Sequence, residues 1–189
     1  MRTLTYYVAA SVDGFIAGPG GEFEFFGFEG DSAAWIVAEY PETLPVQARG
    51  PLGLAGTPNR HFDTVLMGRR TYDPALAAGI SSPYPHLRQL VFSRSLAVPT
   101  EGVEVVADDP VAVARRLKQE QGAGLWLAGG GALAGALRDE VDVLVVKRNP
   151  VVIGAGVPLF AGPFEPTGLR RTGTRAFGTG VVVETYHRP

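Results

Sequence analysis

Three apolar runs in this chain each end in a short turn built from glycine, serine and arginine, and this repeated pattern constrains the fold most. Each run is typical of a buried strand, and the first and third turns lead into a stretch that favours a helix. The turns are Met-Gly-Arg-Arg-Thr-Tyr at 67–72, Phe-Ser-Arg-Ser at 92–95 and Ala-Gly-Gly-Gly-Ala at 128–132. Together they predict an α/β fold whose strand ends form one nucleotide-binding cradle.

The residue types in these turns suit a bound phosphate. Backbone N–H groups at the start of a helix attract anions, and glycine lets a phosphate approach the chain closely. Arg69, Arg70 and Arg94 supply positive charge and forked hydrogen bonds to phosphate oxygens. Taken singly, Arg69-Arg70 is equally a solvated pair at a strand end, and Gly129–Gly131 is equally a tight turn. Taken together, the three turns indicate a dinucleotide, and the arginines favour NADPH over NADH.

The rest of the sequence alternates between strands and helices, which predicts a mixed, mostly parallel central sheet with a late antiparallel pair. The length fits a single domain over residues 1–189. A helix over 110–121 has an acidic cap, a proline in its first turn and a terminating glycine. Residues 41–60 form a long irregular segment, which compact domains usually reserve for function. The other predicted helices cover 33–39 and 132–138, and the predicted strands are Leu4–Ala10, Thr64–Met67, Gln89–Phe92, Leu125–Ala128, Val141–Lys147 and Gly180–Tyr186.

Composition excludes several classes of protein. The formal net charge is −2 and the basic residues are scattered, so we expect no nucleic-acid partner. The chain has no cysteine, and its three histidines have no metal-ligand spacing, so we expect neither disulfides nor a metal site. The apolar runs are far shorter than the ~20 residues that cross a bilayer, and the start lacks a cleavable apolar region. We therefore expect a cytoplasmic protein with no membrane partner.

Five motifs in this order resemble the dihydrofolate reductase superfamily. The three turns fit its general pattern, and two further segments are more particular: Ala-Ser-Val-Asp-Gly-Phe-Ile-Ala at 10–17 and Asn-Pro-Val-Val-Ile-Gly-Ala-Gly-Val-Pro-Leu-Phe at 149–160. Both segments are similar to the reductase domain of the riboflavin-pathway deaminase-reductase and to its small stand-alone bacterial relatives. The resemblance spans nearly the whole chain and implies a three-layer fold of the dihydrofolate reductase type.

The resemblance also implies which residues hold the phosphates of NADPH. Arg69 and Arg94 would hold the adenosine 2′-phosphate. Arg70 and Thr71 would lie where the pyrophosphate meets one helix, and the triple glycine where it meets another. The full set of phosphate-binding candidates is Gly68, Arg69, Arg70, Thr71, Ser93, Arg94, Gly129, Gly130, Gly131 and Ala132.

Two further features are implied near the nicotinamide. The backbone near Ala10 and Ile16 would flank the carboxamide of the ring. The superfamily also places a cis peptide bond inside its paired glycines, which here would be Gly129–Gly130.

Two carboxylates are candidates for the substrate side. In folate reductases a carboxylate early in the first helix anchors the pterin ring, and Asp31 has that place. An anchoring Asp31 would be partly buried with a raised pKa, whereas a helix cap would be exposed. In the riboflavin-type reductases an Asp-Gly pair meets ribityl or ribose hydroxyls, and Asp13 has that place. The alternative for Asp13 is a turn residue. We favour Asp13 for substrate contact and keep both as catalytic candidates.

The resemblance favours an NADPH-dependent reductase that transfers hydride to a pyrimidine- or pterin-like heterocycle or to a small carbonyl compound. The implied activity is similar to that of 5-amino-6-(5-phosphoribosylamino)uracil reductase. The alternatives are a non-catalytic NADP-binding module of the same fold and an unrelated α/β binding protein. A homodimer is also expected, because riboflavin-type relatives pair through their late strands. The apolar runs at 141–146 and 181–183 would need such a cover if they formed an open sheet edge.

Overall fold

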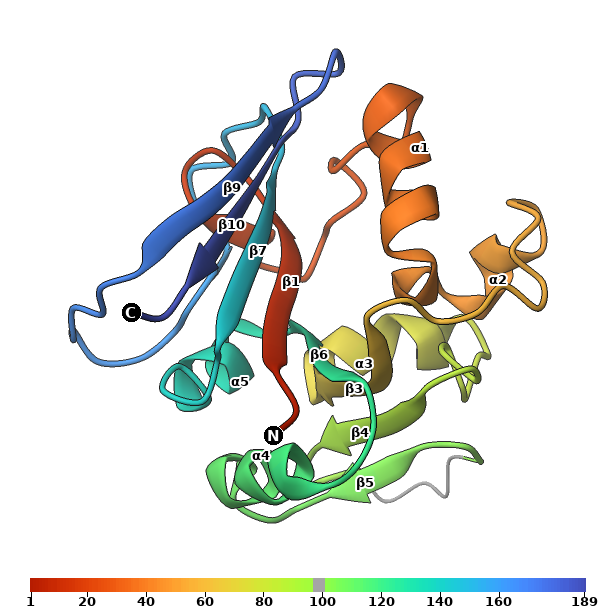
Figure 1. Cartoon of the computed structure of the whole chain (residues 1–189), viewed down its shortest axis with the longest axis vertical. Helices are drawn as coiled ribbons and strands as arrows, with labels where there is room; N and C mark the ends of the chain where they lie inside the picture. The colour runs from red at the N-terminus through yellow and green to blue at the C-terminus, as the bar shows by residue number, and fades with distance from the viewer. Residues whose placement is uncertain (97–100) are drawn as a thin grey trace.

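In residues 1–96 and 101–189, which the computed structural model describes, eight strands form one central sheet. Their order is β5-β4-β3-β6-β1-β7-β10-β9, and all neighbours from β5 to β7 are parallel. The last two strands run antiparallel at the β7 end (Figure 1). The strands are β1 (Leu4–Ala10), β3 (Phe62–Gly68), β4 (Arg88–Phe92), β5 (Glu104–Val106), β6 (Gly124–Gly129), β7 (Val143–Arg148), β9 (Arg170–Ala176) and β10 (Val182–His187). A separate two-stranded sheet pairs β2 (Phe15–Ala17) with β8 (Val157–Pro158).

Helices cover both faces of the central sheet, so the fold has three layers (Figure 1). One face packs against α4 (Pro110–Gln119) and α5 (Gly131–Ala136). The other face packs against α1 (Gly30–Glu39) and α3 (Arg69–Ala77). A short 3-10 helix η1 (Pro41–Thr43) and α2 (Val46–Arg49) follow α1. The mixed, mostly parallel α/β fold expected from the sequence is confirmed.

Successive residues of the central strands enter opposite cores, because side chains alternate across a sheet. In β1, Leu4 and Tyr6 lie in the core beneath α4 and α5. Tyr7 lies in the core beneath α1 and α3, together with Val145 of β7. Both faces of the central strands are therefore buried, which explains their nearly continuous apolar sequences.

The predicted cap of α4 is confirmed. The Asp109 side chain accepts hydrogen bonds from the backbone N–H groups of Val111 (3.4 Å) and Ala112 (3.2 Å). Pro110 occupies the first turn, where its missing N–H costs nothing. The helix ends at Gln119, two residues before the expected boundary.

The irregular segment at 41–60 is held by two buried charged side chains. Glu42 is fully buried, and its Oε1 accepts hydrogen bonds from the N–H groups of His61 (2.6 Å) and Phe62 (3.0 Å). The Arg49 guanidinium donates to the carbonyl oxygens of Pro41 (2.6 Å) and Leu54 (3.0 Å). The Glu42 hydrogen bonds fix the segment to the start of β3, and those of Arg49 hold the segment together internally.

Among the helices in the described residues, none is long and apolar enough to cross a membrane.

Candidate cofactor and substrate site

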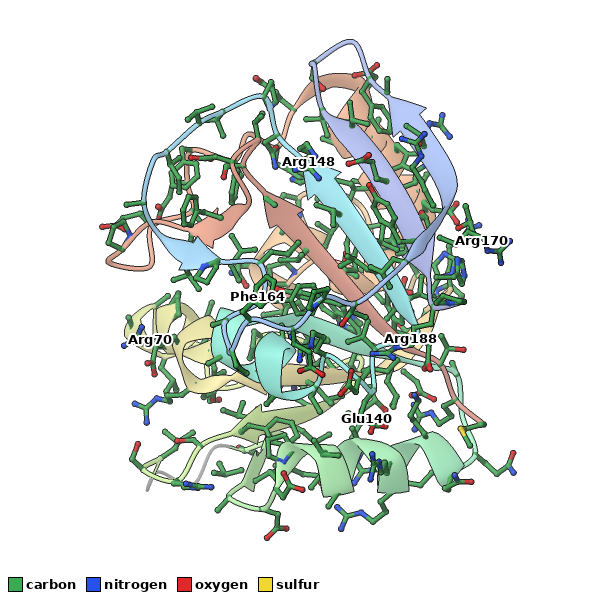
Figure 2. All side chains as sticks on the ribbon, turned by 90° about the vertical axis from the view of Figure 1, so that its left-hand side faces the viewer. Arg70, Glu140, Arg148, Phe164, Arg170 and Arg188 are labelled. Atoms are coloured by element: carbon green, nitrogen blue, oxygen red, sulfur yellow. The ribbon has the colours of Figure 1, made fainter. Side chains whose placement is uncertain are left out.

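The predicted turns lie at the carboxyl ends of the parallel strands of the central sheet. Strands β4, β3, β6 and β1 lie side by side in this order and are parallel, so their carboxyl ends face the same side. Ligands of open α/β sheets bind at this edge. Figure 2 shows Arg148 at the tip of β7 and Arg70 on α3, both toward the side to which the arrowheads of β1 and β7 point.

The first turn begins α3 directly after β3. Gly68 is the N-cap residue, and Arg69 and Arg70 are the first two residues of the nine-residue helix. The first N–H groups of a helix have no carbonyl partner within it, so they can donate to an anion.

The triple glycine packs directly against this helix start. A Cβ on Gly130 would stand 3.4 Å from Oγ1 of Thr71 and 3.7 Å from Cα of Gly68. Gly129 and Gly130 have φ values of 144° and 95°, a backbone conformation that favours glycine. Two turns separated by some sixty positions in sequence therefore pack directly against each other.

The expected cis peptide bond is wrong: within the described residues every peptide bond is trans, including Gly129–Gly130. The chain makes its sharp turn there through the two positive φ angles instead.

The three arginines of the turns differ in what they contact. The Nε of Arg69 forms an ion pair with Asp73 one helical turn later. Arg70 and Arg94 are exposed, and neither forms an ion pair within residues 1–96 and 101–189. The hydroxyl oxygen of Ser93 accepts from the N–H groups of Ser95 (3.2 Å) and Leu96 (3.1 Å), which shapes the turn that carries Arg94. Arg70 and Arg94 are thus the arginines free to meet an anion.

The candidates near the nicotinamide lie where β1 ends. Ala10 is fully buried, and its carbonyl oxygen accepts a hydrogen bond from the N–H of Asn149 at 2.8 Å. Ile16 lies on β2 and packs against the core beneath α4 and α5. A Cβ on Gly131 would collide with the carbonyl oxygen of Pro158, so β8 packs tightly on the first turn of α5, beside Ala132.

Asp13 fastens two loops at this edge. Its carboxylate accepts hydrogen bonds from the N–H groups of Ile153 (3.2 Å) and Gly154 (2.7 Å), in the loop after β7. A hydrogen bond from the Ser11 side chain, followed by those from Gly154 and Ile153, lowers the pKa of this exposed carboxyl. Asp13 is therefore an ionised loop tether, and its contact with a substrate stays a prediction.

Asp31 is exposed in the first turn of α1. Its Oδ2 accepts a hydrogen bond from the N–H of Gly178 (2.7 Å), in the turn between β9 and β10. That hydrogen bond is the main cause that lowers the pKa of Asp31. The partly buried state with a raised pKa, expected of a ring anchor, is therefore wrong. The helix-cap alternative also fails, because the N-cap residue is Glu29 and it makes no side-chain cap hydrogen bond.

Comparison with known proteins identifies the family. Residues 2–183 match the family described as the RibD C-terminal domain. The chain belongs to this family. Two proteins of Bacillus subtilis (strain 168) are similar along almost their whole lengths. "Uncharacterized protein YwjB" is 31% identical over 186 residues, which cover 95% of each chain. "Uncharacterized protein YyaP" is 26% identical over 199 residues, which cover 98% of this chain and 95% of YyaP.

Solved structures share the fold of this RibD C-terminal domain. A protein of Shewanella sp. PV-4, provisionally described as a riboflavin biosynthesis protein, superposes with a TM-score of 0.71 at 23% identity, over 100% of this chain and 99% of that one. Dihydrofolate reductase of Enterococcus faecalis, complexed with NADP(H) and RAB-propyl, gives 0.68 at 15% identity, over 98% and 96%. The Thermotoga maritima diaminohydroxyphosphoribosylaminopyrimidine deaminase/5-amino-6-(5-phosphoribosylamino)uracil reductase gives 0.67 at 14% identity. This chain spans 57% of that protein.

Sequence reasoning missed two residues of this RibD C-terminal domain at the end of β7. Asn149 is buried, and its Nδ2 donates to the carbonyl oxygen of Lys147 at 3.0 Å while its N–H binds Ala10. Asn149 thereby joins the ends of β1 and β7. Lys147 is partly buried on the face toward α1. The available signals were an Asn-Pro pair after an apolar strand and a lysine inside that strand.

Proposed function

We propose that this RibD C-terminal domain is an NADPH-dependent reductase. Its substrate would be a pyrimidine- or pterin-like heterocycle or a small carbonyl compound that accepts hydride. The observation that carries the proposal is the contact between the turns at Gly68 and Gly130, flanked by two arginines without ion pairs. Family membership and the NADP(H) complex of the dihydrofolate reductase neighbour support it.

The residues present fit a dinucleotide phosphate. The glycines at 68, 129 and 130 let the two turns pack closely, and a pyrophosphate would bind beside them at the N–H groups that begin α3. Arg70 and Arg94 would bind the phosphate oxygens, and Arg94 together with Arg69 would recognise the 2′-phosphate. Arg69 would contribute less, because Asp73 already occupies its Nε.

When bound, reduced nicotinamide supplies the hydride. The chain's own residues would orient the ring and exclude water from the transfer. The ends of β1 and β7, joined by Asn149, would form the floor beneath the ring. Asp13 would keep the loop at 149–154 closed over this edge. Asp31 would hold the turn between β9 and β10 against α1.

The test is NADPH consumption, followed by absorbance, across a panel of aminopyrimidines, dihydrofolate and simple carbonyl compounds. We expect turnover with at least one class and a preference for NADPH over NADH. The absence of turnover, together with tight NADPH binding, would favour the second candidate, a non-catalytic NADP-binding module. One observation favours that candidate: both acidic side chains expected on the substrate side are engaged by backbone N–H groups.

We also propose a homodimer, on the basis of the resemblance alone. The open-edge argument from the sequence is wrong, because β7 and β10 lie inside the sheet and β9 forms the edge. That edge strand carries Arg170, Arg171 and Arg175, and charged side chains discourage further strand pairing. A dimer would therefore use a face of the sheet or its loops. Light scattering at micromolar concentration should give twice the 20.0 kDa chain mass; a monomer mass would end the proposal.

A further inference from the structure

The chain contains two lysines, and they differ in whether the ammonium group has a hydrogen-bond partner. Lys118 of α4 is buried, and its Nζ donates to the carbonyl oxygen of Glu140 and to Oδ1 of Asp142, both at 2.8 Å. Lys147 of β7 is partly buried, and within residues 1–96 and 101–189 it has neither a side-chain hydrogen bond nor an ion pair. Burial lowers the pKa of Lys147. Burying the Lys147 ammonium group without a partner costs free energy, so a functional role would explain a lysine at this position.

The sheet register places Lys147 on the face toward α1. It pairs with Ala9 of β1 on one side and with Val183 of β10 on the other, and Val183 pairs with Arg175 of β9. Residues paired in this way point to the same face. Val183 belongs to the core beneath α1 and α3, so the paired residues Ala9, Lys147, Val183 and Arg175 all lie on this face of the sheet.

An aromatic wall stands on the same face. The guanidinium of Arg175 lies 5.7 Å from the ring centre of Trp35, on α1, and 5.4 Å from that of Phe177. The acidic and basic groups named on this face are Arg175 of β9 and Asp31 of α1. The tyrosines of the same core are Tyr7, Tyr40, Tyr72 and Tyr84. Asp31 is engaged by the N–H of Gly178, and in the described residues no carboxylate forms an ion pair with Lys147.

Lys147 is also next to the proposed nicotinamide position. Its partner Ala9 precedes Ala10, where β1 ends, and its own carbonyl oxygen accepts the hydrogen bond from Asn149. Neighbouring strands lie about 4.8 Å apart, so Lys147 is one strand away from the end of β1.

We propose that Lys147 is the proton donor of the reductase. The inference rests on the proposed function. As the C=N or C=O double bond of the substrate is reduced, its carbon receives the hydride and the electron pair of the π bond moves to the nitrogen or oxygen. Nζ of Lys147 gives that atom a proton and is left as a neutral amine, which then regains a proton from water. Bound NADPH would supply the hydride and Lys147 the proton, so the two-electron reduction of the substrate balances. Trp35 and Phe177 would wall a flat substrate beside it.

Replacing Lys147 with methionine tests the role, because methionine keeps the unbranched shape and most of the length of the side chain without the charge. We expect K147M to lower kcat about 100-fold or more, with the Kd for NADPH unchanged. Its thermal midpoint should stay level or rise, since an unpaired charge is removed. The matched variant K118M should lower the midpoint by about 6 °C or more, because it leaves Asp142 unpaired.

Replacing Lys147 with arginine distinguishes a role in proton donation from a role of the positive charge alone. K147R keeps the positive charge but cannot give up a proton at neutral pH. We expect the rate of the wild type to fall at high pH as Lys147 loses its proton. We expect K147R to be as slow as K147M and to lack this fall. Full turnover of either variant on a substrate of the wild type would overturn the proposal.

A second measurement needs no substrate. Lysine labelled with ¹³C at Cε gives only two signals in this chain. We expect the pKa of Lys147 to lie below the ordinary lysine value, because the side chain is partly buried. We also expect the Lys147 signal to shift when NADPH is added, while the Lys118 signal stays still. If NADPH binds but the Lys147 signal does not move, the inference falls and the proposed function stands. If NADPH does not bind at all, both fall.

Discussion

Replacing Arg94 with alanine should weaken NADPH binding about ten- to hundredfold and leave NADH binding nearly unchanged. Arg94 is exposed after β4 and has no ion pair in the described part of the chain, so its guanidinium is free for a 2′-phosphate. A charge-assisted hydrogen bond contributes about 1.5–3 kcal/mol, which corresponds to this range. Isothermal titration of both cofactors gives the two affinities directly.

Two further variants act as controls for this effect. Arg69→Ala should change NADPH affinity in the same direction but less, since the Nε of Arg69 is already paired with Asp73. Arg170→Ala removes an equal charge from the exposed edge strand β9 and should leave both affinities unchanged. An equal loss of NADPH and NADH affinity in Arg94→Ala would show that Arg94 does not recognise the 2′-phosphate.

Replacing Gly135 with alanine should lower the free energy of unfolding by about 1–3 kcal/mol or more. Gly135 lies in α5, and a Cβ there would overlap the carbonyl oxygen of Ala161. The obstacle is backbone, held by the hydrogen bond from the N–H of Ala161 to the carbonyl oxygen of Gly131 (2.9 Å), so it cannot move aside alone. Urea denaturation measures the loss.

Gly50→Ala is the matched control for Gly135→Ala. Gly50 has a φ of −61°, which any residue adopts, and a Cβ there would meet nothing within 4 Å. We expect it to be neutral or to stabilise the fold by about 0.4–1 kcal/mol, through the lower entropy of the unfolded chain. Equal denaturation midpoints for the two variants would contradict the tight packing of α5 against residue 161.

The parts of the fold that the sequence predicts are those determined by local chemistry and two-faced burial. Strands β1, β3, β6 and β7 are buried on both faces, so their sequences are nearly continuous runs of apolar residues. The edge strands show no such signal. Strand β9 is exposed along nearly its whole length and carries arginines, and β5 has three residues. Their pairing depends on neighbours rather than on their own sequences.

In the candidate site, too, the features set by adjacent residues were predictable and those set by distant partners were not. The glycine turns were predictable because positive φ angles and helix starts depend on adjacent residues. The states of Asp13 and Asp31 were not, because their hydrogen-bond partners are 141 and 147 residues away in sequence. Lys147 was missed because it completes an apolar strand, and only the sheet register shows that it faces α1 without a partner.

The central claim is that the two glycine turns and Arg94 form a binding site for NADPH at the carboxyl ends of the parallel strands. The most direct test is titration calorimetry of the wild-type chain with NADPH and NADH, repeated with Gly130→Val. Gly130 has a φ of 95° and lies against Thr71 and Gly68, so a branched side chain would be strained and would push the two turns apart. We expect the wild type to bind NADPH at least tenfold more tightly than NADH, and Gly130→Val to abolish both affinities while remaining folded. Absence of NADPH binding to the wild type, or undiminished binding to Gly130→Val, would contradict the claim.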